Sequence, residues 1–203
     1  MLEVYGDIQS GNCYKVKLLL RHLDLAHRWT PVDILQGATA TAEFLAMNPN
    51  GKIPVLVLED GQCLSESNAI LNYLAHDTPY LPGGALERAR VLQWQFFEQY
   101  SHEPYIAVAR FIARYLGLPD ERRGEFEAKK AGGYKALGVM ERALHDSSYL
   151  AGDVLTIADI SLYGYTHVAH EGGFDLTGYP GVQRWLRRIE QHPRHISMAE
   201  AAV

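Results

Sequence analysis

The sequence predicts a mixed α/β domain followed by an all-helical domain. Patterns typical of strands and helices alternate over the first 76 residues, whereas no convincing strand pattern follows them. Between the two parts lies a short segment rich in proline and glycine, which is typical of a linker. We therefore predict an α/β domain at residues 1–76, a linker at residues 77–84 and a helical domain at residues 85–203.

The N-terminal patterns follow the order strand, helix, strand, helix, strand, strand, helix. The first helical pattern is marked by Val16, Leu19 and Leu23, which recur at helical spacing. The dipeptide Asp60-Gly61 predicts the turn of a β-hairpin. The predicted strands are residues 2–5, 28–34, 54–58 and 62–64, and the predicted helices are residues 12–23, 40–47 and 67–76. One mixed sheet with helices on its faces fits this order.

The second domain shows four long helical patterns. They cover residues 85–115, 122–145, 156–169 and 180–191. A kink is expected in the first of them at Pro104, because proline has no N–H to donate within a helix. A short helix is expected after Pro193.

The charge and hydropathy patterns argue against nucleic-acid binding and membrane insertion. The net charge is −5, so no basic excess steers the chain towards nucleic acid or anionic lipid. No apolar run approaches the ~20 residues of a membrane span, and the first residues lack the basic and apolar regions of a signal peptide. We therefore expect a cytoplasmic protein in which Cys13 and Cys63 are free thiols.

Three segments of the first domain resemble the glutathione-site motifs of cytosolic glutathione S-transferases. They are Ser10-Gly-Asn-Cys-Tyr-Lys-Val16, Asn48-Pro-Asn-Gly-Lys-Ile-Pro-Val-Leu56 and Leu64-Ser-Glu-Ser-Asn-Ala-Ile-Leu-Asn-Tyr-Leu74. The segment Leu155-Thr-Ile-Ala-Asp-Ile160 resembles the capping motif of that family's helical domain. The start at Ser10 is most similar to bacterial serine-type members of the theta-like, zeta-like and nu-like groups. The resemblance spans nearly the whole chain, and it implies a thioredoxin-like α/β domain, an all-α domain, glutathione as co-substrate and a homodimer.

The resemblance implies that Ser10 and Asn12 are the catalytic residues. A cysteine-like thiol has a pKa of about 8.5, and lowering this pKa by 2 takes about 2.7 kcal/mol of preferential stabilisation of the thiolate. The hydroxyl of Ser10 would donate to the thiolate, together with the N-terminus of the following helix. The amide of Asn12 would support Ser10 or donate to the sulfur. The structural alternatives are a helix cap for Ser10 and helix initiation for Asn12.

Cys13 has two interpretations. A cysteine near a helix N-terminus can be acidified and reactive, and some relatives use a cysteine in this region for thiol transfer. Alternatively, Cys13 points into the protein and has a structural role.

The resemblance also implies a glutathione-binding set. Ile53 precedes Pro54, which is cis in the family, and its main chain would pair with the cysteinyl unit like an added strand. Lys52 would meet the glycyl carboxylate. Ser67 would hold the γ-glutamyl carboxylate at the N-terminus of a helix, and Glu66 would pair with the ligand's ammonium group. Gln36 and Asn48 are further polar candidates from loops. The structural alternatives are a simple strand entry for Lys52, Ile53 and Pro54, and a helix-capping segment for Glu66 and Ser67.

The helical domain offers candidates for the second-substrate pocket and a folding element. His102 and Tyr105 are the candidates for contact with the second substrate, although aromatic residues at helical spacing more often belong to the core. Thr156 and Asp159 match a capping box with Asp in place of Glu. No His, Cys or acidic residues occur at the spacing of a metal site, so no metal is expected.

These observations predict a glutathione S-transferase that stabilises the glutathione thiolate for attack on small apolar electrophiles. Two alternatives remain open. One is a glutathione-dependent disulfide reductase, and the other is a non-catalytic family member that binds glutathione, apolar ligands or another protein. The pocket for the electrophile is built from variable side chains, so the sequence does not predict the electrophile.

Overall fold

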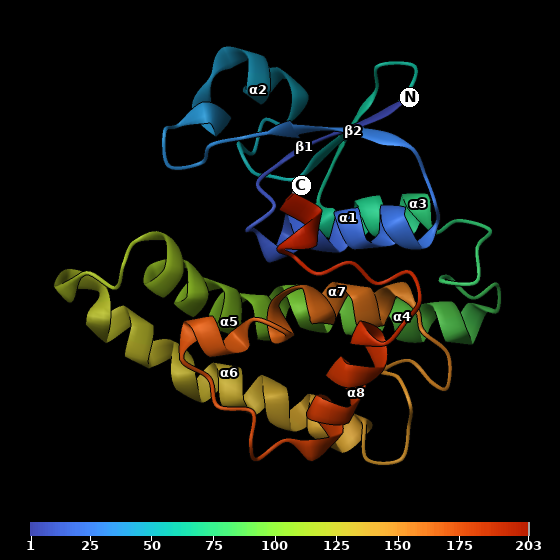
Figure 1. The fold of residues 1–203 in the computed structure, drawn as a ribbon, viewed down its shortest axis with the longest axis vertical. Helices are drawn as coiled ribbons and strands as arrows, with labels where there is room; N and C mark the ends of the chain where they lie inside the picture. The colour runs from blue at the N-terminus through green and yellow to red at the C-terminus, as the bar shows by residue number, and fades with distance from the viewer. Residues whose placement is uncertain (203) are drawn as a thin grey trace. The chain divides into compact units, whose positions relative to one another are not determined.

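The computed structural model describes residues 1–202 and divides the chain into two compact units (Figure 1). The first unit contains residues 1–78 together with the residues from Pro193 onward, and the second contains residues 79–192. Our prediction had placed the C-terminal residues in the helical domain. They belong with the first unit because the Tyr14 hydroxyl donates to the Ile196 carbonyl at 2.7 Å and Arg194 donates to the His22 carbonyl at 2.6 Å.

The first unit contains a four-stranded mixed sheet, as predicted. The strands are β1 (Leu2–Gly6), β2 (His27–Pro31), β3 (Val55–Val57) and β4 (Cys63–Ser65), in the order β2-β1-β3-β4. β1 and β2 are parallel, whereas β3 runs antiparallel to both β1 and β4. The register therefore aligns Thr30, Tyr5, Val55 and Ser65 in one row across the sheet.

Helices cover both faces of this sheet. α1 (Gly11–His22) and α3 (Ser67–Leu74) lie side by side on one face, and α2 (Ala42–Met47) lies over the other (Figure 1). Successive strand residues point to opposite faces. Val55 packs with Phe44 on the α2 side, so the fully buried Val4 and Leu56 face the layer of α1 and α3. Because apolar side chains cover both faces, the sheet lies at the core of the unit.

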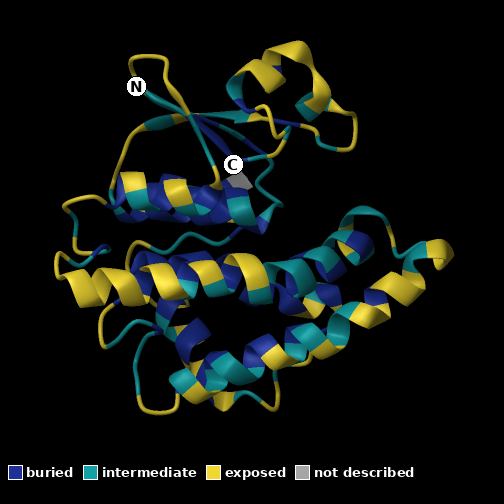
Figure 2. Ribbon diagram, turned by 180° about the vertical axis from the view of Figure 1, so that it is seen from behind, coloured by how far each residue is buried: buried dark blue, intermediate teal, exposed yellow. Residues whose placement is uncertain are grey.

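The second unit is helical. Its α-helices are α4 (Ala85–Phe97), α5 (Glu103–Arg110), α6 (Arg123–Ala143), α7 (Ile157–Thr166) and α8 (Pro180–Glu190). Figure 2 shows α6 buried along one side and exposed along the other, which is the pattern of an amphipathic helix. All ten residues of α7 are buried, so this helix occupies the centre of the unit.

The predicted helix at residues 85–115 is interrupted twice in the structure. Wide π-helical turns, η2 (Glu98–His102) and η3 (Phe111–Tyr115), precede and follow α5. Pro104 lies in the first turn of α5, where the missing N–H costs no internal hydrogen bond. The chain thus accommodates the proline by starting a new helical segment after a π-turn. Such turns occur where the regular ladder of helix hydrogen bonds is interrupted.

Short 3₁₀ segments complete the chain. They are η1 (Ala38–Ala40), η4 (Asp120–Arg122), η5 (Ala169–Gly172) and η6 (Glu200–Ala202). The short helix expected after Pro193 corresponds to η6, which begins seven residues later than that proline.

The predicted capping box at the start of α7 is present. The Thr156 hydroxyl accepts from the Ala158 N–H, and the Asp159 carboxylate accepts from the Thr156 N–H at 3.0 Å. Asp159 also accepts from the Leu150 N–H at 2.8 Å and from the Trp185 indole at 2.9 Å. This fully buried carboxylate therefore ties the start of α7 to α8 and to the preceding loop.

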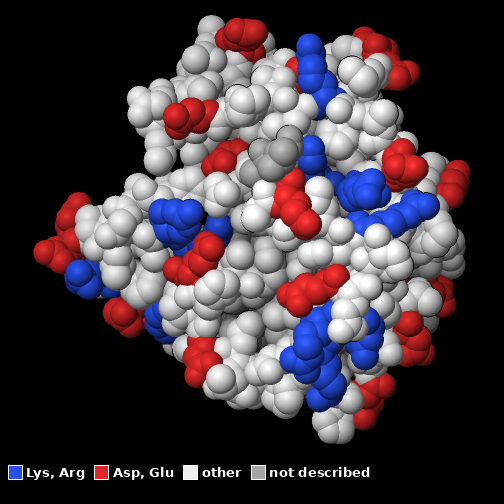
Figure 3. All heavy atoms as spheres, in the orientation of Figure 1, with Lys and Arg blue, Asp and Glu red and all other residues white. Residues whose placement is uncertain are grey.

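The surface carries charges of both signs. On the face shown in Figure 3, basic side chains are interspersed with acidic ones. Within residues 1–202, no helix is both long and apolar enough to span a membrane.

Candidate functional site

The residues predicted to bind glutathione converge on one edge of the sheet. β4 ends and β3 begins at the row formed by Tyr5 and its neighbours, and β1 and β2 end one residue beyond it. The segments just beyond this row carry Ser10 after β1, Gln36 after β2, Ile53 before β3 and Ser67 after β4. Residues from four separate parts of the sequence are thus brought to one edge by the strand register.

Two helix N-termini meet at this edge. α1 begins at Gly11 and α3 begins at Ser67. The Ser67 hydroxyl donates to the Asn12 side-chain oxygen at 3.4 Å, although these residues are 55 positions apart in the sequence. The first N–H groups of any helix lack partners within the helix, and the helix dipole adds partial positive charge there. The paired N-termini therefore favour the binding of a negatively charged group at this edge.

Ser10 occupies the cap position of α1 without capping it. Its carbonyl accepts from the N–H groups of Cys13 at 3.1 Å and Tyr14 at 2.8 Å, and its own N–H donates to the Asp7 carbonyl at 2.9 Å. The main chain is thereby fixed in an extended conformation with φ −75° and ψ 123°. The side-chain oxygen does not cap the helix.

The peptide at Ile53 lies directly before β3 and outside the sheet. The Ile53–Pro54 bond is cis, as the resemblance implied. β3 begins only at Val55, and the N–H and C=O of Ile53 make no main-chain hydrogen bond among the described residues. An extended peptide bound here can pair with both groups as an added strand does.

Glu66 connects β4 to α3 in an unusual conformation. Its φ of 65° and ψ of 109° are rarely adopted by residues with a side chain. This conformation turns the chain sharply into α3, so that Ser67, which is only 6% exposed, becomes the first helical residue. The Glu66 side chain remains exposed at the positive end of that helix.

Comparisons with known proteins agree with this geometry. Residues 9–77 match the model of the glutathione S-transferase N-terminal domain, and residues 93–193 match that of the C-terminal domain. A glutathione S-transferase structure from Pseudomonas fluorescens [Pf-5] is 62% identical with a TM-score of 0.96, covering 97% of this chain and 98% of that one. The chain belongs to the glutathione S-transferase family.

Two further relatives of this glutathione S-transferase family member are informative. Disulfide-bond oxidoreductase YfcG of Escherichia coli (strain K12) is 31% identical over 95% of this chain and 92% of its own length. A glutathione transferase structure from Burkholderia graminis holds two glutathione molecules per protein subunit. It is 27% identical with a TM-score of 0.83, and the match covers 98% of this chain and 86% of that one.

Asn48 has a different role from the one predicted for it. We expected it to contact the ligand from a loop, but it is only 3% exposed. Its amide nitrogen donates to the Lys52 carbonyl at 2.7 Å, and its oxygen accepts from the Asn50 N–H at 3.1 Å. Asn48 therefore braces the loop that leads to Ile53, because both ends of its amide are already used.

Lys52 and Gln36 stay accessible at the same edge. Both side chains are exposed. The main chain of Gln36 is held by its N–H, which donates to the Asp33 carboxylate at 3.2 Å. The structure therefore gives both residues the exposure that contact with a ligand requires.

The two cysteines differ sharply in accessibility. Cys63 is exposed, whereas Cys13 is fully buried in α1. Burial raises the pKa of the Cys13 thiol to about 12, although hydrogen bonds from the Ser10 side chain and the Asp7 main chain oppose the rise. Cys13 therefore keeps its proton at neutral pH and lacks the thiolate character of a nucleophile.

His102 does not have the exposure that contact with a second substrate requires. It is fully buried, and its Nε2 lies 2.9 Å from the Thr166 hydroxyl, which itself donates to the Leu162 carbonyl. We predicted His102 from its spacing near Tyr105, but the helical pattern does not distinguish an inward from an outward position across the π-turn at residues 98–102. His102 is therefore an interior residue of the helical unit.

Tyr105 lines a cavity of about 210 Å³ within the helical unit, together with Phe97 and Tyr100. Its ring lies against α6 at Gly132, where a Cβ atom would come within 2.2 Å of the ring. The ring is partly exposed, so Tyr105 has the surface that contact with a small apolar molecule needs.

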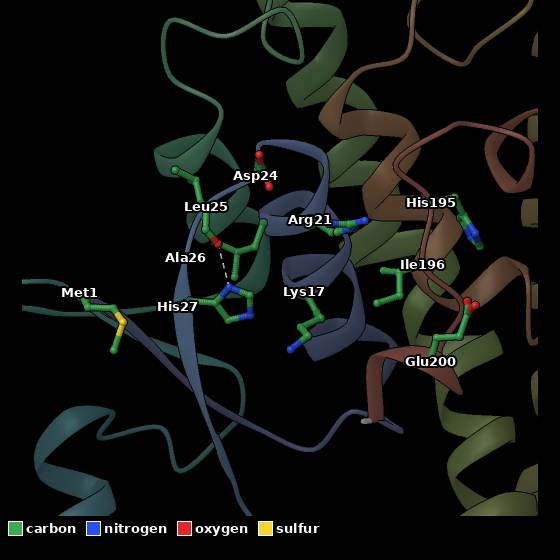
Figure 4. A pocket seen from close by; sticks show the side chains of 11 residues that line it. Met1, Lys17, Arg21, Asp24, Leu25, Ala26, His27, His195, Ile196 and Glu200 are labelled. Carbon is green, nitrogen blue, oxygen red and sulfur yellow. Dashed lines mark hydrogen bonds between the residues drawn. The ribbon is translucent and has the colours of Figure 1, made fainter.

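A larger cavity of the first unit lies away from the candidate site. This cavity, of about 640 Å³, is shown in Figure 4. It is lined by Met1, by Lys17 and Arg21 of α1, by His27 at the start of β2 and by His195. These residues lie towards the opposite ends of β1 and β2, so the cavity contains none of the predicted glutathione-binding residues. In residues 1–202, no group of three or more His, Cys, Asp or Glu side chains is arranged to hold a metal ion.

Proposed function

We propose that this protein is a glutathione transferase that binds glutathione at the sheet edge where α1 and α3 begin. The observation that supports this most directly is the contact between Ser67 and Asn12, which joins the two helix N-termini beside Ser10. Glutathione carries two carboxylates, an ammonium group and a thiol along an extended peptide. The edge offers a matching group for each of them.

The proposed binding mode assigns one group to each part of the ligand. The cysteinyl unit pairs with the main chain of Ile53, and Lys52 meets the glycyl carboxylate. The γ-glutamyl carboxylate lies at the N-terminus of α3 beside Ser67, and Glu66 pairs with the ammonium group. Gln36 adds a polar contact from the segment after β2.

In this binding mode the glutathione sulfur lies at the start of α1. The Ser10 hydroxyl donates a hydrogen bond to the sulfur, and the first N–H groups of α1 add positive potential. Both stabilise the thiolate over the thiol, so the bound thiol ionises at a lower pH than the free one. The thiolate then attacks a small apolar electrophile held beside it, and the preorganised donors and the proximity of the reactants supply the rate.

The test combines glutathione calorimetry with conjugation of an aryl halide. Ser67→Ala and Glu66→Gln are each expected to weaken glutathione binding about tenfold, because each removes one charge-assisted contact. Glu59→Gln is the matched control, since Glu59 is an exposed glutamate in the turn between β3 and β4, at the opposite ends of these strands from the edge. Absence of measurable glutathione binding by the unaltered protein would refute the proposed function.

Disulfide reduction is a second candidate function. It is favoured by the similarity to Disulfide-bond oxidoreductase YfcG and to a structure that holds two glutathione molecules per subunit. In this reaction one glutathione thiolate displaces a thiolate from the disulfide, and a second glutathione attacks the mixed disulfide. The products are two thiols and glutathione disulfide. A small disulfide assayed beside the aryl halide distinguishes the two reactions, and tight binding without either turnover indicates a binding protein.

We also propose that the protein is a homodimer. Leu92, Phe96 and Tyr100 recur at intervals of four residues along α4 and η2, and their exposed fractions are 39%, 69% and 85%. Exposed apolar rows of this kind commonly mark an interface between proteins. Phe96→Glu is expected to convert a dimer to a monomer in light scattering, whereas an unaltered monomeric protein would contradict the proposal.

A further inference from the structure

The cavity shown in Figure 4 is built from separate parts of the first unit. One wall comes from α1, a second from the turn between α1 and β2, and a third from the C-terminal segment. The volume of about 640 Å³ is in the range of pockets that hold small molecules. None of the residues proposed to bind glutathione lines this cavity, so a molecule bound in it leaves the glutathione site open.

One part of the cavity lining is apolar. It consists of Leu20 of α1, Leu25 of the following turn and Ile196 of the C-terminal segment. Leu20 is fully buried beneath the cavity, whereas Leu25 is 38% exposed. An apolar body placed among these three side chains removes their remaining exposed surface from water, which stabilises the bound state.

Lys17 and Arg21 bring positive charge to the same cavity. They are four residues apart on α1, so their side chains project from one face of the helix, between His27 and Ile196 in Figure 4. Among residues 1–202, neither side chain makes a hydrogen bond or an ion pair. The Lys17 Nζ lies 5.2 Å from the centre of the Trp29 ring, and burial lowers the pKa of this ammonium group. Lys17 is thus a cation partly removed from water without a counter-ion, and binding an anion offsets that cost.

The acidic side chains at the cavity do not neutralise this charge. Glu200 accepts from the N–H and the hydroxyl of Ser197, at 2.9 Å and 2.7 Å, so its carboxylate is already held within its own segment. Asp24 is exposed to water, and it forms no ion pair in the part of the chain that the structure describes. The half-buried charge of Lys17 therefore has no opposite charge paired with it among the described residues.

Three other polar groups at the cavity already have partners. The Met1 ammonium forms an ion pair at 2.8 Å with a glutamate of the turn between β3 and β4. The Nδ1 of His27 donates to the Leu25 carbonyl at 2.9 Å, and burial, together with the nearby lysine of α1, holds the pKa of this imidazole below its usual range. The Nε2 of His195 lies 3.4 Å from the Tyr14 hydroxyl. The two basic side chains of α1 are therefore the groups best placed to meet a negatively charged ligand.

We propose that this cavity is a second ligand site, which binds a small organic carboxylate with an aliphatic body. The carboxylate pairs with Lys17 and is approached by Arg21 from the next turn of α1. The aliphatic body lies against the apolar part of the lining, so the two ends of the ligand match the two kinds of surface in the cavity. The site does not depend on the proposed function, because it shares no residue with the glutathione edge.

The test measures binding of octanoate by calorimetry, with the uncharged octanamide as the matched probe. Octanoate is expected to bind with a Kd on the order of 0.1 mM, and octanamide about tenfold more weakly. Lys17→Met keeps an unbranched apolar side chain but removes the charge, and it should weaken octanoate binding about tenfold. Arg21→Gln should weaken it about threefold, because Arg21 is exposed. Lys129→Met is the matched control, since Lys129 is a half-buried lysine of α6 whose Nζ lies 6.0 Å from the centre of the Tyr105 ring.

Two further measurements locate the ligand. Octanoate bound at Lys17 is expected to change the tryptophan fluorescence of the protein, and Trp29→Phe should abolish that change, because Trp29 is the ring beside Lys17. Ala26→Phe places a large side chain in the cavity and should weaken octanoate binding at least about tenfold. Ala26 is exposed, so this variant is expected to fold, which circular dichroism checks.

The outcomes separate this site from the glutathione site and from the helical unit. Saturating glutathione should change octanoate affinity by less than about twofold. Competition between the two ligands would overturn the proposal, as would an effect of Lys129→Met equal to that of Lys17→Met, a fluorescence change that persists in Trp29→Phe, or equal affinity for octanoate and octanamide. Absence of octanoate binding would also overturn it and leave the proposed function intact. If the protein binds octanoate as expected but no glutathione, the second site stands and the proposed function fails.

Discussion

The starts of α1 and α7 place a hydroxyl residue at the same position and use it in opposite ways. At α7 the Thr156 hydroxyl accepts from the Ala158 N–H, and Asp159 completes the capping box. Thr156 is only 2% exposed. At α1 the Ser10 hydroxyl does not cap the helix, and Ser10 lies partly exposed at the sheet edge. One hydroxyl stabilises its helix, whereas the other leaves the N-terminus of its helix available.

This difference gives a criterion for separating structural from functional caps. α2 supports it, because Thr41 accepts from the Phe44 N–H at 3.2 Å and is not one of the predicted site residues. A hydroxyl residue that precedes a long helix and leaves it uncapped gives up the stability of a cap, which is about 1 kcal/mol. Such a residue is a candidate for a direct role in binding or catalysis.

The largest effect is expected at the α7 cap. Asp159→Ala leaves the buried donors of Leu150, Thr156 and Trp185 without an acceptor, and each lost partner costs about 1–3 kcal/mol. We expect the free energy of unfolding to fall by about 3–5 kcal/mol in denaturant titrations. A loss below about 1 kcal/mol would mean that this carboxylate contributes little to the helical unit.

Ser10→Ala is expected to lower turnover strongly while leaving the stability of the fold nearly unchanged. Turnover of an aryl halide should fall about a hundredfold, the effect of losing one donor to a developing anion. The free energy of unfolding should change by less than about 0.5 kcal/mol, because no cap is lost. Should this variant lose as much stability as a true cap variant, Ser10 belongs with Thr156 and the comparison fails.

Thr156→Ala sharpens the comparison by removing the matching hydroxyl at α7. We expect a loss of about 1–2 kcal/mol in the free energy of unfolding, because the Ala158 N–H loses its acceptor in a buried position. The pKa of bound glutathione, measured on the folded protein, should stay unchanged. A change in that pKa would show that the α7 cap is coupled to the site.

The smallest effect is expected at Thr41. This residue is exposed, so water replaces its cap on α2 when the hydroxyl is removed. Thr41→Ala should lower the free energy of unfolding by about 0.5–1 kcal/mol without altering turnover. A cost equal to that at Thr156 would argue that burial does not determine the value of a cap in this chain.

The sequence predicted those features that depend on residues close together in the chain. The order of strands and helices along the first unit, the turn at Asp60-Gly61 and the capping box at Thr156 each rest on a short pattern, and the structure contains all three. Family membership was also predicted, because its motifs are short segments whose order along the chain is kept.

The features that the sequence did not predict depend on contacts between distant residues. The bond between Asn12 and Ser67 joins residues 55 apart, and no local pattern indicates it. His102 was misassigned because the π-turn at residues 98–102 changes which residues face inward. Asn48 lies beside the site, but its amide is used within its own loop, and only the hydrogen-bond geometry reveals this.

The C-terminal segment has a consequence for how this protein is made. The unit that carries Ser10 is discontinuous, because the residues after Pro193 dock on α1 through Tyr14 and His22. A ribosome therefore releases the last piece of this unit only after the whole helical unit has been synthesised. Removing the final ten residues would leave every helix of the second unit intact, yet it would uncover the helix whose first turn presents Ser10.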